Sequence, residues 1–168
     1  MSPSVRRAGG LCLTLFLAAL AQSVWADAMQ IRGARPDILT AAAILGALFC
    51  DANGGAALGF AAGLIHASLA APPNGGFGGL IVSRTLVAAT IGWLDERVFR
   101  DNALIAVALV AGGTALAEGL FFLFAPQPHV AQWAKAVLLT TLYNTILALP
   151  LYFLIRRLTG ETKRAIDF

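Results

Sequence analysis

Charged residues are scarce in this chain, and their scarcity sets the first limit on what the protein can be. Asp, Glu, Lys and Arg make up 12% of the 168 residues, whereas 58% of the residues are hydrophobic. Soluble domains carry about 25% charged and roughly 45–50% apolar residues. The basic residues lie scattered at the ends of apolar runs and form no basic face, so we expect no nucleic-acid partner. The composition indicates an integral membrane protein surrounded by lipid.

Cysteine, and with it the usual signatures of metal sites, is almost missing. Cys12 and Cys50 both lie in apolar runs, without C-x-x-C spacing or neighbouring histidines, so neither a disulfide nor a metal site is expected. The sequence contains no Ser/His/Asp arrangement typical of hydrolases and no phosphate-binding loop. We therefore expect no catalytic residues, no cofactor and no enzymatic activity.

Apolar runs fill most of the chain and are separated by short polar turns. About 20 apolar residues in a helix cross the hydrocarbon core of a bilayer. The sequence thus predicts an all-α fold, a polytopic membrane helix bundle that forms a single domain over 1–168. The expected transmembrane helices are 9–26, 38–50, 56–71, 77–94, 103–125 and 133–155.

Two of these six runs differ from an ordinary transmembrane helix. The run 9–26 follows Arg6 and Arg7 and ends in small residues, which also describes a cleavable secretory signal; five spans would then remain. The run 38–50 rises only about 20 Å as a helix, short of the roughly 30 Å core. It needs flanking residues, a thinner bilayer or a place inside the bundle.

The distribution of basic residues predicts the orientation of the bundle. Cytoplasmic loops of membrane proteins carry an excess of Lys and Arg. With six spans and a cytoplasmic N-terminus, three basic residues lie outside and a larger set lies inside: Arg6, Arg7, Arg97, Arg100, Arg156, Arg157, Lys163 and Arg164. Both termini are therefore predicted to be cytoplasmic.

Three ionisable side chains fall at a similar depth within the predicted spans. At 1.5 Å per residue, Arg84 and Glu118 lie about 11 Å, and His66 about 8 Å, below the outer boundary. Because an ionisable group inside a span is costly and usually finds a partner, we predict an Arg84–Glu118 pair with His66 beside it. The alternative is that Arg84 extends to the outer surface and Glu118 stays protonated.

Other polar residues lie within or at the ends of the runs. Asn144 follows Tyr143 near the middle of the last run, where its amide needs a partner. We predict that these two residues take part in interhelical hydrogen bonding. Asp37 and Asp51 flank the short second run and are interpreted as solvated end residues.

Small residues are spaced four apart along the third run. Gly55, Gly59, Gly63 and Ala67 form a ridge on one helix face, which lets another helix approach closely. That helix belongs either to this same chain or to a partner protein with a single span. The fifth run carries a similar face, which contains Ala108, Ala111 and Ala115.

Several short motifs, in order, resemble a known family. They are Arg35-Pro36-Asp37 before the short run, the glycine-rich stretch 59–64, Leu142-Tyr143-Asn144, and the closing 154–157. Together they resemble the rod shape-determining protein MreD family over nearly the whole chain. One departure concerns His66, because family members commonly carry an acidic residue in that neighbourhood. A role that depends on that acid is not carried over.

The resemblance implies a non-enzymatic scaffold in the bacterial cytoplasmic membrane that maintains rod shape during cell-wall elongation. It implies binding to MreC, and a wider complex with the MreB filament, the RodA glycosyltransferase and a class B penicillin-binding transpeptidase. It also implies a fold similar to the S components of energy-coupling-factor transporters. The alternative function is a substrate-binding membrane subunit of a vitamin or small-molecule transporter, because the cluster of Arg84, Glu118 and His66 is similar to what a pocket open to the outside would need.

Overall fold

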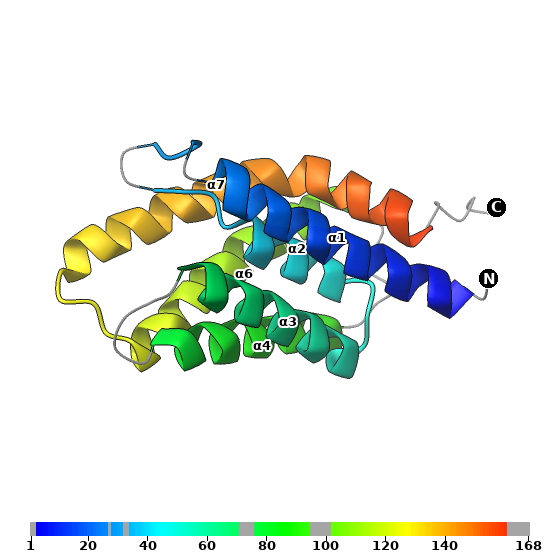
Figure 1. The fold of residues 1–168 in the computed structure, drawn as a ribbon, viewed down its shortest axis with the longest axis horizontal. Helices are drawn as coiled ribbons and strands as arrows, with labels where there is room; N and C mark the ends of the chain where they lie inside the picture. The colour runs from blue at the N-terminus through cyan, green and yellow to red at the C-terminus, as the bar shows by residue number, and fades with distance from the viewer. Residues whose placement is uncertain (1–2, 27, 32–33, 71–75, 95–101, 161–168) are drawn as a thin grey trace.

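Helices dominate the secondary structure of the part of the chain that the structure describes. The computed structural model describes residues 3–26, 28–31, 34–70, 76–94 and 102–160. In these ranges it contains helices α1 (Pro3–Trp25), α2 (Ile38–Ala47), α3 (Ala52–Ala70), α4 (Gly76–Trp93), α6 (Ala103–Phe124) and α7 (Val130–Thr159) (Figure 1). Helices α1, α4, α6 and α7 are long and apolar enough to cross a membrane. The prediction of an all-helical membrane bundle is confirmed at this level.

The helix ends differ from the ends of the apolar runs for local reasons. Helix α2 stops at Ala47, three residues before the predicted end, and the chain then turns. Helix α3 begins at Ala52, earlier than predicted, and the Asp51 side chain accepts a hydrogen bond from the Gly54 N–H at 2.8 Å. Helix α7 extends to Thr159, where Gly160 ends it in a left-handed conformation. Helix α3 thus begins before its apolar run and α7 extends beyond its own, whereas α2 is shorter than the run that contains it.

The short helix α2 lies inside the bundle. All ten of its residues are buried, and it contacts α1, α3, α4, α6 and α7. Figure 1 shows it in cyan at the centre, with α1 on one side and α3 on the other. These neighbours shield α2 from lipid, as expected for a run that is too short to cross the bilayer.

The glycine ridge of α3 packs on α4. A Cβ atom added at Gly59 would lie 2.8 Å from Ala88 Cβ, and one added at Gly63 would lie 2.7 Å from Ile81 Cα. Contacts this close require glycine, because real Cβ atoms essentially never come nearer than about 3 Å. Ala67 continues the ridge and is fully buried. The ridge therefore serves packing within the chain, and the alternative of a partner protein at this face is wrong.

The first and last helices of the chain, α1 and α7, meet at one end of the bundle. A Cβ added at Gly10 in α1 would lie 2.9 Å from the backbone nitrogen of Thr159 in α7. The beginning of α1 and the end of α7 are accordingly neighbours (Figure 1). At the opposite end, α1, α3 and α6 finish while α2, α4 and α7 begin. The polar residues of the candidate site come from this second end.

Candidate functional site

Asp37 caps the first turn of α2 deep within the protein. Its carboxylate accepts hydrogen bonds from the Thr40 N–H at 3.0 Å and from the Thr40 hydroxyl at 2.5 Å. Aspartate is a preferred residue at this position because it satisfies an N–H group that the helix leaves unpaired. The expectation that Asp37 is a solvated end residue is wrong, since the residue is only 4% exposed. The reason is that α2 lies inside the bundle, so its first turn does too.

Arg84 of α4 joins Asp37 to Glu118 of α6. Its Nη2 lies 3.2 Å from Asp37 Oδ2 and also contacts Glu118 Oε1. Its Nε donates to the Thr40 hydroxyl at 3.2 Å, and Nη1 donates to the Ser83 hydroxyl at 2.9 Å. The structure therefore brings Arg84 and Glu118 into contact, as their depth predicted. Arg84 is 2% exposed, so the alternative in which it extends to the surface is wrong.

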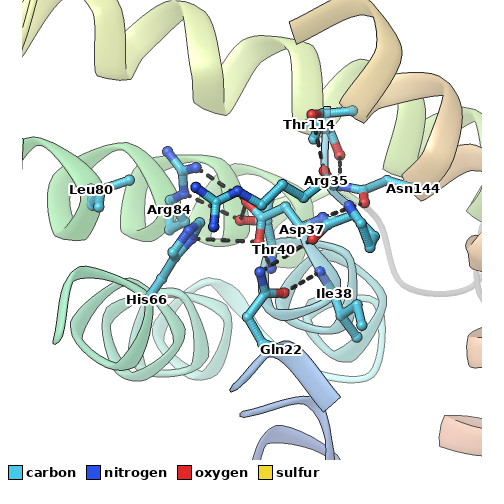
Figure 2. A network of polar contacts seen from close by, with 12 residues as sticks. Gln22, Arg35, Asp37, Ile38, Thr40, His66, Leu80, Arg84, Thr114 and Asn144 are labelled. Atoms are coloured by element: carbon cyan, nitrogen blue, oxygen red, sulfur yellow. Dashed lines mark hydrogen bonds and ion pairs between the residues drawn. The ribbon is translucent and has the colours of Figure 1, made fainter. Parts of the chain in front are cut away.

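His66 of α3 completes the group. Its Nδ1 lies 3.4 Å from Asp37 Oδ1, so it approaches the acid that sequence reasoning left out of the cluster. This nitrogen is buried, and none of the described residues forms a hydrogen bond with it. We call the set Asp37, Thr40, His66, Arg84 and Glu118 the polar hub (Figure 2). The hub places two carboxylates on one guanidinium nitrogen, with an imidazole beside them.

Asn144 ties α7 to the start of α2. Its Oδ1 accepts from the Asp37 backbone N–H at 3.0 Å, and its Nδ2 donates to the Thr114 hydroxyl of α6 at 3.1 Å. These bonds cross between helices, as predicted for an amide in the middle of a span. The Tyr143 hydroxyl instead donates to the Met29 carbonyl at 2.8 Å, in the segment that follows α1. For Tyr143 the predicted interhelical bond is thus wrong, because its partner lies outside a helix.

The Arg35-Pro36-Asp37 segment is also held by a side chain of α1 and by a second side chain of α7. The Gln22 side chain of α1 donates to the Pro36 carbonyl at 3.2 Å and accepts from the Ile38 N–H at 2.8 Å. The Thr140 hydroxyl of α7 donates to the Arg35 carbonyl at 3.1 Å. Sequence reasoning missed Gln22 and Thr140. Gln22 could have been found, because an amide near the end of an apolar run needs a partner by the same argument that was applied to Asn144.

A cavity of about 440 Å³ adjoins the polar hub. Four helices and the segment before α2 contribute to its wall, so it lies where the second end of the bundle is assembled. Both polar and apolar side chains line it, among them Gln22, Arg35, Asp37, His66, Leu69, Glu118, Trp133 and Val137. In the described part of the chain, no group of three or more His, Cys, Asp or Glu residues is placed to hold a metal ion. The wall of this cavity carries charged and hydrogen-bonding side chains together with apolar ones.

A scan against family models, a search of curated proteins and a search of solved structures each found no match to the chain. The geometry of the bundle and of the polar hub therefore provides the grounds for assigning a function.

Proposed function

We propose that this protein is a non-enzymatic scaffold of the MreD type in the bacterial cytoplasmic membrane. In this proposal the chain crosses the membrane six times, with both termini in the cytoplasm and a fold similar to the S components. It holds the single span of MreC and so links cell-wall synthesis to the MreB filament. RodA and a class B penicillin-binding transpeptidase belong to the wider complex.

The placement of the family-like motif supports this proposal. Arg35-Pro36-Asp37 lies where α1, α2, α4 and α7 are joined by hydrogen bonds or ion pairs, and Asn144 of the Leu142-Tyr143-Asn144 motif binds the same segment. Residues that carry the resemblance are therefore residues that build the bundle. Two of the four motifs, Arg35-Pro36-Asp37 and Leu142-Tyr143-Asn144, therefore meet in the structure.

The observation that carries the scaffold proposal is an outward-facing stripe of small residues on α6. We call Ala108, Ala111, Gly112, Ala115 and Gly119 the α6 stripe. A Cβ added at Gly112 or Gly119 would have no described atom within 4 Å. Large apolar side chains flank the stripe, with Leu104 and Leu123 more than 70% exposed.

The α3 ridge indicates what such a stripe can do in a membrane. Lipid tails are as apolar as leucine, so helices associate in bilayers through close backbone approach, which small residues permit. In this chain the α3 ridge is filled by α4, whereas the α6 stripe is left open. We infer that a single-span partner helix occupies this open stripe, with Leu104 and Leu123 packing against it at the two ends of the stripe.

Substitution on the α6 stripe tests the proposal. We expect Gly112→Leu to insert and fold normally, because a Cβ atom added there has no described atom within 4 Å, but to reduce co-purification of MreC by blocking close approach. Gly9→Leu is the matched control, since Gly9 is also exposed with nothing within 4 Å. Normal recovery of MreC with Gly112→Leu would contradict docking at the stripe. Failure of the wild-type protein to recover MreC would contradict the scaffold function itself.

A second candidate function is a substrate-binding subunit of a small-molecule transporter. The cavity beside the polar hub favours it, because ligand pockets are typically about 300–1,000 Å³ with a few convergent polar groups. A binding screen of the purified protein against vitamins separates the two functions. Submicromolar binding of a vitamin would favour the transporter subunit over the scaffold.

A further inference from the structure

The start of α1 and the end of α7 form a close helix crossing, far from the polar hub (Figure 1). A Cβ atom added at Gly10 would lie 2.5 Å from the Leu158 carbonyl oxygen, so the two backbones touch at this point. Both helices are long and apolar enough to cross a membrane. The crossing coincides with the ends of their apolar runs, and therefore with the level at which the lipid headgroups of a bilayer begin.

Each helix carries two consecutive arginines at this crossing, and the fold uses one of each pair. On α7, Arg156 donates to the Tyr152 hydroxyl at 3.2 Å. On α1, Arg7 is half-buried and already interacts with other atoms of the chain. The other two, Arg6 and Arg157, are exposed, and neither forms a hydrogen bond or ion pair with another described residue. These two side chains are the ones available to a ligand.

Arg6 reaches from α1 across to the end of α7. Its guanidinium lies over Gly160, because a Cβ added there would be 2.9 Å from Arg6 Nη2 and would also contact its Cζ. Arg157 precedes Gly160 by about one helical turn and so lies on nearly the same side of α7. Two cations from different helices thus flank one helix end, where they repel each other. An anion bound to both removes that repulsion.

The described part of the chain supplies no carboxylate for these two arginines. Neither α1 nor α7 contains an acidic residue. Among the described acids, Asp37 and Glu118 belong to the polar hub near the opposite end of the bundle. Asp51 accepts from the Gly54 N–H at the start of α3, and its backbone packs against Gly92 of α4. The described residues therefore leave the place of the counter-anion open to a molecule from outside the chain.

Apolar side chains continue from the arginines along both helices. On α1, Leu13 and Phe16 are exposed about two and three turns after Arg6, on the same helix face. On α7, Phe153 is exposed about one turn before Arg157. Cationic groups above an exposed apolar surface match the two parts of a phospholipid. A free phosphate would contact the arginines alone.

We propose that the crossing of α1 and α7 binds the headgroup of an anionic phospholipid. Its phosphate accepts hydrogen bonds from the guanidinium groups of Arg6 and Arg157, and its acyl chains lie along the exposed apolar side chains of both helices. Guanidinium groups match the geometry of phosphate oxygens, and basic sites between transmembrane helices bind anionic headgroups. The proposal requires that α1 and α7 cross the membrane, and it holds whether or not the protein binds MreC.

Retention of lipid by the purified full-length protein tests the proposal. The protein is released in a mass spectrometer from nanodiscs that contain equal amounts of phosphatidylglycerol and phosphatidylethanolamine. Both lipids have a phosphate, but the ammonium of ethanolamine cancels its charge. We expect the wild type to retain phosphatidylglycerol in preference to phosphatidylethanolamine. Equal retention of the two lipids would overturn the proposal.

Single substitutions connect the retained lipid to the residues. Arg6→Gln and Arg157→Gln should each lower the preference for phosphatidylglycerol about fivefold, the size expected for one basic residue at an anionic headgroup. Neither side chain has a hydrogen-bond partner among the described residues, so circular dichroism should show an unchanged fold in both variants. Lys135→Gln is the matched control, because Lys135 is exposed on α7 about 33 Å before Arg157. An unchanged preference in both arginine variants would refute the assignment.

A relocated charge separates a binding site from diffuse attraction between the protein and the membrane. Ala8 is exposed and lies about 200° around α1 from Arg6. The double variant Arg6→Gln, Ala8→Arg restores the net charge of this helix end but moves the guanidinium away from α7. We expect it to retain lipid as Arg6→Gln does. Recovery of the wild-type preference would show that charge alone attracts the lipid, and would overturn the site at the crossing.

Discussion

Replacing Arg84 by methionine should be among the most damaging single changes in this protein. The substitution keeps an unbranched side chain of similar length but removes the guanidinium. Four hydrogen bonds are lost, to Thr40, Ser83, Asp37 and Glu118. Two carboxylates then remain inside the bundle without a cation, apart from the contact of Asp37 with His66.

The expected size of the effect follows from burial. Arg84 is 2% and Asp37 is 4% exposed, so neither charge is relieved by solvent in the folded state. Removing one partner of a buried ion pair costs about 3–5 kcal/mol, because the remaining charge is left uncompensated. We expect the free energy of unfolding of Arg84→Met to fall by about that amount.

Reversible unfolding in mixed detergent micelles, followed by circular dichroism, measures this change. The triple variant Asp37→Asn, Arg84→Met, Glu118→Gln removes both stranded charges and should recover at least half of the lost stability. Lys135→Met is the control, since Lys135 is exposed and its replacement should change stability by less than about 0.5 kcal/mol. A loss below about 1 kcal/mol in Arg84→Met, or no recovery in the triple variant, would refute the reasoning.

Two further predictions concern packing and hydrogen bonding. Gly59→Ala should lower the free energy of unfolding by about 1–3 kcal/mol, because the new Cβ meets Ala88. Gly112→Ala is the control and should be neutral or slightly stabilising. Equal effects of the two substitutions in the same assay would contradict the close packing of the α3 ridge on α4. Asn144→Leu should cost about 2–4 kcal/mol, because two bonds are lost and the buried Asp37 N–H is stranded. Thr145→Val, which removes a bond within α7 only, is its control, and a similar loss in both would count against the role of Asn144.

Depth arguments predicted part of the site from the sequence. Arg84, Glu118 and Asn144 lie inside long apolar runs, so each had to find a partner, and counting residues from the run ends placed Arg84 and Glu118 at one level. The same count placed His66 near them. Periodicity identified the α3 ridge, because glycine every fourth residue has few uses other than close packing.

Asp37 and its partners could not be predicted in the same way. A residue at the end of an apolar run looks solvated unless the run is known to lie inside the bundle, and that depends on the five helices that surround α2. Thr140 donates to the backbone carbonyl of Arg35, and the sequence does not indicate which carbonyl lies near a given hydroxyl. The choice of α4 as the partner of the α3 ridge likewise depends on tertiary packing.

The placement of α2 has a consequence for how the protein is made. Ten residues rise about 15 Å, so this helix cannot cross a bilayer alone, and the backbone at its start needs donors and acceptors from elsewhere. One of those comes from Asn144, more than one hundred residues later. We therefore expect α2 to reach its final packing only after α7 has been synthesised and has entered the membrane.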